Sequence, residues 1–148
     1  MTKHDAVKKY FEPKIQELTS DVLHFNHSPE SANSFGLITN YAEQVIKKFI
    51  NGDARKTYGF TIEVIKEYST YDDDLNLECM NFVQGFMDWL DGQNEKKEYP
   101  DFGENCKVET IEILQNMPNF AGVNPEAGLA RYMVQGRILY IERDKNKI

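Results

Sequence analysis

The chain has 148 residues, enough for one domain and too few for two of ordinary size. Hydrophobic residues make up 41% of the chain and aromatic residues 12%, which is sufficient for a buried core. With 17 basic and 24 acidic residues, the formal net charge is −7, which argues against a protein that holds nucleic-acid phosphates by bulk attraction.

No targeting or membrane segment is expected in this sequence. The N-terminal stretch lacks the apolar region of a signal peptide. No apolar stretch approaches the roughly 20 residues that a membrane-spanning helix needs. Cys79 and Cys106 fit no metal or redox spacing, so we expect reduced thiols of a cytosolic protein, with a disulfide between them as the less favoured alternative.

The first predicted element is a helix over about residues 5–22. Its apolar face is formed by Val7, Phe11, Ile15, Leu18 and Val22. Pro13 interrupts this pattern, so the helix is either kinked or restarts with Glu12-Pro13 in a first turn. Residues 24–36 are rich in Ser, Asn and Pro and indicate a loop with a short strand at its edge, followed by a short strand over 34–39.

A β-hairpin is predicted over residues 45–68. Asn51-Gly52 favours a type I′ turn, in which both central residues need positive φ. From Tyr58 to Tyr68 apolar and polar residues alternate, which predicts a long strand with one apolar face. Ile65 interrupts the polar face, so the strand either bends there or is buried on both sides.

A second helix is predicted over residues 73–91. Ser69 with Asp72, and Thr70 with Asp73, match the spacing of a capping box. The apolar stripe of the helix consists of Leu75, Cys79, Phe82, Phe86 and Leu90. Asp91-Gly92 supplies the expected C-terminal stop.

Two further strands are predicted, over about 106–115 and 129–142. The loop 116–128 between them contains two prolines and two glycines, and residues 143–148 are expected to form a frayed tail. Gly136, within the last strand, indicates a bulge or bend. Because a tight hairpin requires antiparallel pairing, we expect one α+β domain: a single, mostly antiparallel sheet with long strands, covered by one or two helices.

Patterns that could bind a metal ion are incomplete. His24 and His27 could supply two ligands, but no nearby Cys, His or acidic residue completes a site. The run from Asp72 resembles the start of a calcium loop, yet Leu77 and Val83 stand where glycine and glutamate are required. We therefore expect no metal and no cofactor, and attribute the acidic run to helix capping.

No catalytic motif is complete either. Residues 100–103, PDFG, imitate the kinase magnesium motif, but the glycine-rich loop and the catalytic loop are missing. Glu109 and Glu112 could act as an acid–base pair, although acidic pairs on a charged strand are usually solvated. We expect no enzyme, and interpret the over-long strands as parts of an assembly surface, because sheet edges are natural places for subunit pairing.

Residues 40–142 resemble the small minor capsid proteins of tailed phages and prophages of Gram-positive bacteria, which look like tail-completion, or tail-terminator, proteins. The shared elements are the hairpin, a strand ending in Tyr, a helix with an F-x-x-W-L/I pattern and a final strand that begins with ARY. They correspond here to Lys47, Phe49, Gly52, Tyr58, Phe60, Tyr68, Phe86, Trp89, Leu90, Ala130, Arg131, Tyr132 and Tyr140. The first 40 residues match less closely.

The resemblance implies an α+β fold without enzymatic activity that assembles into a homo-hexameric ring. Such a ring caps the tail tube of the phage virion and joins it to the head, after assembly in the host cytoplasm. Its partners would be other copies of itself, the major tail tube protein and the head connector protein. DNA would pass through the ring without specific binding, and an acidic channel would suit this passage because it repels phosphates.

Two alternatives remain open. One is a head-side connector, the stopper or adaptor of the same neck, which would be a strand-rich barrel with less helix. The other is a small-molecule-binding or enzymatic α+β domain. Its pocket would have to use tyrosines of the apolar sheet face, namely Tyr58, Tyr68, Tyr132 and Tyr140.

The candidate assembly residues lie in the hairpin turn, in the long loop and on the last strand. They are Asn51, Gly52, Asp53, Asn119, Phe120, Val123, Asn124, Arg131 and Arg137. We expect the loop to be mobile in the free subunit and to become ordered against a neighbour, with Phe120 as its apolar anchor and Arg131 as a charged contact. The alternative is a surface loop that Phe120 fixes on its own subunit.

Overall fold

The computed structural model describes residues 2–19, 23–26, 32–115, 117, 119–124 and 126–143, and it has the predicted α+β fold. The two helices are α1 (Lys3–Thr19) and α2 (Asp73–Lys96). The strands are β1 (His24–Phe25), β2 (Ser34–Lys48), β3 (Ala54–Glu67), β4 (Cys106–Ile113), β5 (Asn119–Asn124) and β6 (Leu129–Glu142). No helix in these ranges is long and apolar enough to span a membrane.

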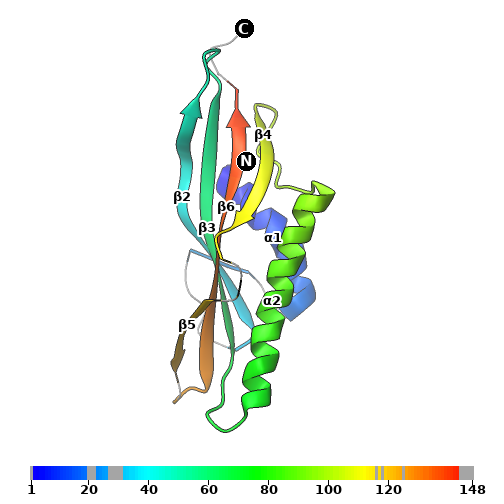
Figure 1. Cartoon of the computed structure of the whole chain (residues 1–148), viewed down its shortest axis with the longest axis vertical. Helices are drawn as coiled ribbons and strands as arrows, with labels where there is room; N and C mark the ends of the chain where they lie inside the picture. Colours follow the sequence, from blue (N-terminus) through cyan, green and yellow to red (C-terminus); the bar gives the residue numbers. More distant parts are fainter. Residues whose placement is uncertain are drawn as a thin grey trace.

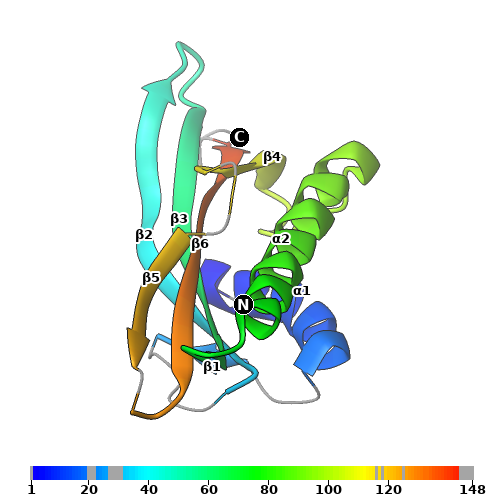
Figure 2. The ribbon, with the colours of Figure 1, turned by 60° about the horizontal axis from the view of Figure 1, so that its bottom comes forward.

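All the strands belong to one sheet with the order β1-β2-β3-β6-β4. The short strand β5 also pairs with β6. It pairs with the first half of β6, whereas β4 pairs with the second half of β6. Only β1 is parallel to its neighbour, so the sheet is mostly antiparallel, as predicted. Both helices cover one face of the sheet, and the β2–β3 hairpin extends past them at one end of the molecule (Figures 1 and 2).

The core lies between the helices and the covered face of the sheet. The ring of Phe11 on α1 packs 5.3 Å from that of Phe60 on β3 and 6.3 Å from that of Phe86 on α2. The predicted apolar stripes of α1 and α2 and the apolar face of β3 all contribute to this cluster. Helix α1 continues through Pro13, so the alternative of a restart at Glu12-Pro13 is wrong. Val22 lies outside the described residues.

The hairpin is longer than predicted, and its turn is of another kind. The short strand expected at 34–39 and the first hairpin strand are one 15-residue strand, β2, which has three register shifts after Thr39. The predicted type I′ turn is wrong, because Gly52 has positive φ (93°) but Asn51 does not. Instead the Asn51 Oδ1 atom accepts a hydrogen bond from the Asp53 amide at 3.0 Å, so the side chain makes the tight turn.

Strand β3 is buried on both faces, which was one of the two alternatives suggested by Ile65. Thr57, Thr61, Glu63 and Ile65 face away from the helices and are nevertheless buried. At Gly59, which also faces outward, a Cβ atom would lie 2.4 Å from the ring of Tyr41. Longer side chains of the neighbouring strands thus cover the central strand.

Helix α2 begins as predicted but ends later. Asp72 is the N-cap, and its Oδ1 atom accepts a hydrogen bond from the Leu75 amide at 3.0 Å. Asp91-Gly92 does not stop the helix, which runs to Lys96 and is capped by Lys97 in a left-handed conformation. The extra turn is fixed by Asn94, which accepts from the Ile111 amide at 2.9 Å and donates to its carbonyl at 2.5 Å. The tertiary contact between Asn94 and Ile111 therefore stabilises the helix beyond the stop signal at Asp91-Gly92.

The last third of the chain differs in part from two expectations. The segment expected as a loop over 116–128 contains strand β5, and Phe120 contacts Tyr68 and Tyr132 of its own subunit, as in the alternative of a surface loop that Phe120 fixes there. Gly136 causes no bulge in β6, since it pairs in register with Phe60 and Ile113. A Cβ atom at Gly136 would lie 2.6 Å from the Phe60 ring and 3.0 Å from the Glu112 carbonyl oxygen, so this glycine allows close packing. The expected tail at 143–148 is described only at Arg143.

Candidate assembly site

The free end of the β2–β3 hairpin, residues 42–56, is here called the arm. Residues 34–37 of β2 are buried, whereas 42–48 are all exposed. Val45 and Ile46 are 47% and 51% exposed, and Ile50 at the tip is fully exposed. Among the described residues β1 pairs with β2 only at Gly36 and Leu37, so the arm has an open edge. An open edge beside exposed apolar side chains is typical of a surface that binds another chain.

One face of the arm is stabilised by cations stacked on an aromatic ring. The Lys47 ammonium lies 5.4 Å from the centroid of the Phe49 ring, and the Arg55 guanidinium lies 5.8 Å from it. The Arg55 Nε atom also donates to Glu109 on β4 at 2.8 Å. These contacts fix the tip without any help from the helices.

The other face of the arm is hollowed and basic. A hollow of about 340 Å³ is lined by Val45, Lys48, Gly52, Ala54, Lys56, Glu142 and Arg143, and is here called the arm hollow. Glu142 is buried and pairs with Lys56. Lys48 and Arg143 pair with no carboxylate among the described residues. The hollow therefore carries uncompensated positive charge next to apolar walls.

The base of the arm is connected to the first turn of α1. The Lys3 Nζ atom lies 2.9 Å from a Glu43 oxygen and 4.0 Å from a Glu142 oxygen. Burial alone would lower the pKa of Lys3, but the hydrogen bond to Glu43 and the negative charges nearby raise it above its ordinary value. Lys3 therefore stays protonated and holds the arm against the helix layer.

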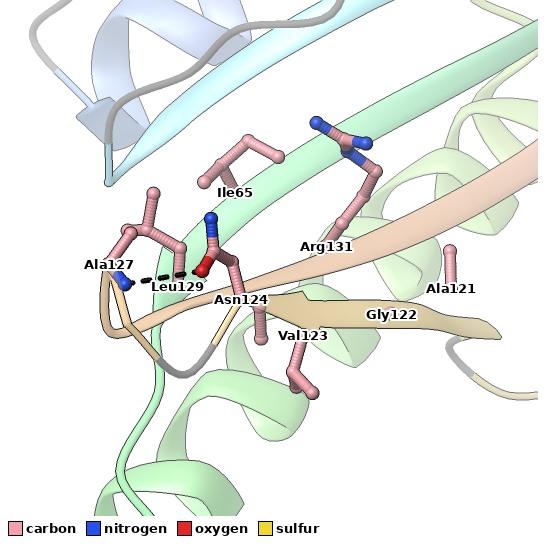
Figure 3. Close-up of a pocket in the computed structure, with 9 residues that line it drawn as sticks. Ile65, Ala121, Gly122, Val123, Asn124, Ala127, Leu129 and Arg131 are labelled. Carbon is pink, nitrogen blue, oxygen red and sulfur yellow. Dashed lines mark hydrogen bonds between the residues drawn. The ribbon is translucent and has the colours of Figure 1, made fainter.

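The end of the molecule opposite the arm carries β5. Its Phe120 ring lies 5.4 Å from the ring of Tyr132 and 6.3 Å from that of Tyr68, yet Phe120 and Val123 remain exposed. A cavity of about 460 Å³ lies here between β3, β5 and β6 (Figure 3). Ile65, Asn124 and Arg131 project to the same side of the sheet, and Val123 to the other. The Arg131 Nε atom is 3.7 Å from buried Glu63.

The structure does not bring the nine sequence-predicted assembly residues together. Asn51, Gly52 and Asp53 form the turn of the arm. A second group lies at the opposite end and consists of Asn119, Phe120, Val123, Asn124 and Arg131, the side chain of Asn119 being outside the description. Arg137 lies between the two ends, where its Nε atom is 2.6 Å from Glu112.

The sequence pattern did not identify several exposed apolar residues, among them a group in the arm and a group at the start of α2. Val45, Ile46 and Ile50 belong to the arm, and Tyr71 and Leu77 lie where α2 begins. Val45-Ile46 could have been found, because two adjacent apolar residues in a strand point to opposite faces and one must leave the core. Tyr71 could not, since a lone aromatic residue in a turn has no periodic partner.

The tyrosines considered for a ligand pocket are core residues. Tyr58, Tyr132 and Tyr140 are buried, and Tyr68 packs on the core cluster. The Tyr58 hydroxyl lies 2.6 Å from Thr39 and 2.8 Å from the His4 Nδ1 atom, so its polar end is already bonded. Burial raises the pKa of Tyr58 above its ordinary value. In the described part of the chain, no three acidic, His or Cys side chains are close enough to hold a metal ion.

No protein-family model matches the sequence, and no curated protein is significantly similar to it. Among the described residues, the arm combines an open sheet edge with three exposed aliphatic side chains, those of Val45, Ile46 and Ile50.

Proposed function

We propose that the chain is a structural subunit of a phage tail-completion, or tail-terminator, ring at the head-proximal end of the tail tube. The observation that carries this proposal is the arm, with its open edge and exposed Val45, Ile46 and Ile50. Apolar side chains on a projecting sheet edge would promote aggregation unless another chain covers them. The partners would be other copies, the major tail tube protein and the head connector.

The positions of the residues that carry the family resemblance support this proposal. Tyr58, Phe60, Phe86, Tyr132 and Tyr140 are buried in the core. Lys47, Phe49 and Gly52 belong to the arm and its turn. The residues that carry the resemblance therefore form the core and the arm. A family of ring-forming proteins would need to share both of these features.

The fold also favours this function over the alternatives. A head-side connector was expected to be a strand-rich barrel with less helix, whereas this chain has an open sheet and a 24-residue α2. A ligand-binding domain needs convergent polar groups in a pocket. The tyrosines that would supply them lie in the core instead.

Deletion of the gene from the phage genome that carries it tests the proposal. We expect filled heads beside tails that are unjoined or too long, and rescue by a plasmid copy, as seen by electron microscopy of lysates. Heads that have lost their DNA beside tails of normal length would indicate the head-side connector instead. Normal joined virions would contradict both functions.

A further inference from the structure

An exposed acidic turn lies at the end of the molecule opposite the arm. It consists of Tyr71–Asp74 and is here called the acidic turn. Tyr71 is 98% exposed, although it is a large aromatic residue. Asp72 caps α2, whereas the carboxylates of Asp73 and Asp74 make no hydrogen bond or ion pair with a described residue. One helical turn further, Leu77 is also exposed.

The arm hollow complements the acidic turn in both charge and polarity. It presents Lys48 and Arg143, which form no ion pair with a described residue, and its walls include Val45 and Ala54. The acidic turn presents Asp73 and Asp74, whose carboxylates have no ion-pair partner in the described part of the chain, beside the exposed ring of Tyr71. In a chain with a net charge of −7, a hollow with an excess of positive charge is the place where an acidic segment meets least repulsion.

The acidic turn cannot reach the arm hollow of its own subunit. Strand β3 runs from Ala54, in the hollow, to Glu67, shortly before the turn. At about 3.3 Å per residue, the twelve residues from Lys56 to Tyr68 span roughly 40 Å. Figure 1 shows the arm and the β3–α2 connection at opposite ends of the molecule. Any contact between the two surfaces therefore joins different copies.

We propose that the acidic turn of one copy binds in the arm hollow of the next copy. Tyr71 packs against Val45 and Ala54, and Asp73 and Asp74 face Lys48 and Arg143. This inference rests on the proposed function, since it names the surfaces that form the joints of the ring. Because the two surfaces differ, the contact is head-to-tail, and its repetition closes into a ring or continues as a filament.

Reversal of the charges on each surface provides a sharp test. One variant carries Lys48→Glu and Arg143→Glu, and the other carries Asp73→Lys and Asp74→Lys, with the capping Asp72 retained. In each variant alone both surfaces have the same sign, so self-association should weaken at least about tenfold. An equimolar mixture should restore it, because every joint between unlike copies then pairs opposite charges.

Sedimentation velocity at millimolar protein and low salt measures these changes. The control variants Lys9→Glu with Lys96→Glu, and Asp88→Lys with Asp91→Lys, change the net charge equally at exposed positions elsewhere and should associate like the wild type. Added salt should weaken the wild-type association. A wild type that stays monomeric, reversed variants that associate normally, or a mixture without rescue would each overturn the inference.

Zero-length carbodiimide crosslinking of the wild type is an independent readout. A crosslink between Lys48 and Asp73 or Asp74 is expected, and the separation within one copy makes it intermolecular. Absence of this crosslink under conditions where the wild type self-associates would overturn the inference.

Complementation of the gene deletion separates the inference from the proposed function. Reversed variants that fail singly but complete tails together support both. If the deletion leaves normal virions while the mixing experiment succeeds, the proposed function is contradicted and the proposed contact between copies is supported. If each reversed variant completes tails and associates normally, the joint fails and the function stands.

Discussion

Tyr140, at the base of the arm, has a buried hydroxyl group that lowers the stability of the fold. Its ring is buried, lies 5.0 Å from the ring of Phe102 and is covered by the Lys3 ammonium at 5.5 Å. Its hydroxyl oxygen has no hydrogen-bond partner among the described residues. Burial, with the nearby charges of Glu43 and Glu142, raises its pKa well above the ordinary value.

Replacement of Tyr140 by Phe should therefore raise the free energy of unfolding by about 1 kcal/mol, because it removes a buried, unsatisfied hydroxyl group. Tyr58→Phe is the matched control, since its hydroxyl is bonded to Thr39 and His4. We expect that variant to lose about 1 kcal/mol. Urea unfolding followed by circular dichroism compares the two variants, and equal losses would contradict this view of Tyr140.

The buried tyrosines also predict a loss of stability at alkaline pH. Burial raises the pKa of Tyr10 to about 12, and the pKa values of Tyr58, Tyr132 and Tyr140 are raised as well. An unfolded tyrosine has a pKa of about 10, so above that pH the folded state binds more protons than the unfolded state.

This contribution to stability is complete below pH 10 and is lost as the pH rises from 10 towards 12 and beyond. Burial also raises the pKa values of the Cys79 and Cys106 thiols, so urea midpoints measured at intervals between pH 8 and 12 should begin to fall near pH 9 and fall more steeply above pH 10. Tyr140→Phe should make the fall less steep. A midpoint that stays constant up to pH 12 would mean that the phenols ionise freely in the folded state.

Helix α2 is the element that closes the core, and its apolar stripe is less uniform than its spacing suggests. Phe86 is buried and contacts Phe11, Phe35 and Trp89. Phe82, one turn earlier, is only half-buried, with the Lys66 ammonium 4.1 Å from its ring centroid. The sequence places both residues on the same stripe, but the sheet covers only one of them fully.

Phe86→Ala should therefore cost about 3–5 kcal/mol of unfolding free energy, as is usual for aromatic truncation in a core. Phe82→Ala should cost clearly less, because part of its ring already contacts solvent and the rest contacts the Phe35 ring and the Lys66 ammonium. Chemical denaturation of both variants tests this order. A larger loss for Phe82 would mean that α2 is rotated about its axis relative to the arrangement described above.

Elements with unbroken periodicity were predictable from the sequence, and those fixed by distant contacts were not. The alternation in β3 and the capping pattern of α2 predicted the end of β3 and the start of α2 to within about one residue. Strand β2 was split in the prediction, because its register shifts break the alternation around Tyr41. The six-residue strand β5 lies where the sequence predicts a loop, because Gly122 (φ 158°), a register shift and neighbouring prolines interrupt the strand pattern.

The candidate site was predictable only in part, for the same reason. The turn at Asn51-Gly52 is local, so the tip of the arm could be located. The pair Arg137–Glu112 and the contact between Asn94 and Ile111 join different elements and leave no local pattern. The pairing of β3 with β6 determines which side chains meet in the arm hollow, and this pairing cannot be predicted from the spacing of residues in the sequence.

At the scale of the whole molecule, stability should vary along the sheet. The middle of β3 is buried on both faces and paired on both sides. In the arm, β2 is exposed, and its outer edge is open among the described residues. Amides in such peripheral segments exchange through local opening, and those of the core only through global unfolding.

Hydrogen exchange of the free subunit should show this gradient. The amides from Tyr58 to Val64 are expected to exchange slowest, and those from Val45 to Lys48 fastest among the strands. Mass spectrometry of peptic fragments resolves these segments. Equal protection of both would mean that the arm is covered in solution even without its partner.

The position of β6 in the sheet has a consequence for synthesis. Among the described residues it is the last strand in sequence, yet it lies between β3 and β4, and it pairs with β3 along all 14 residues. A ribosome that adds about 5–20 residues per second completes β6 roughly 4–15 seconds after β3. During that interval the nascent chain exposes a long unpaired strand edge, which makes it a substrate for chaperones. A nonsense mutation before residue 129 would make this exposure permanent, and truncated products should appear in inclusion bodies.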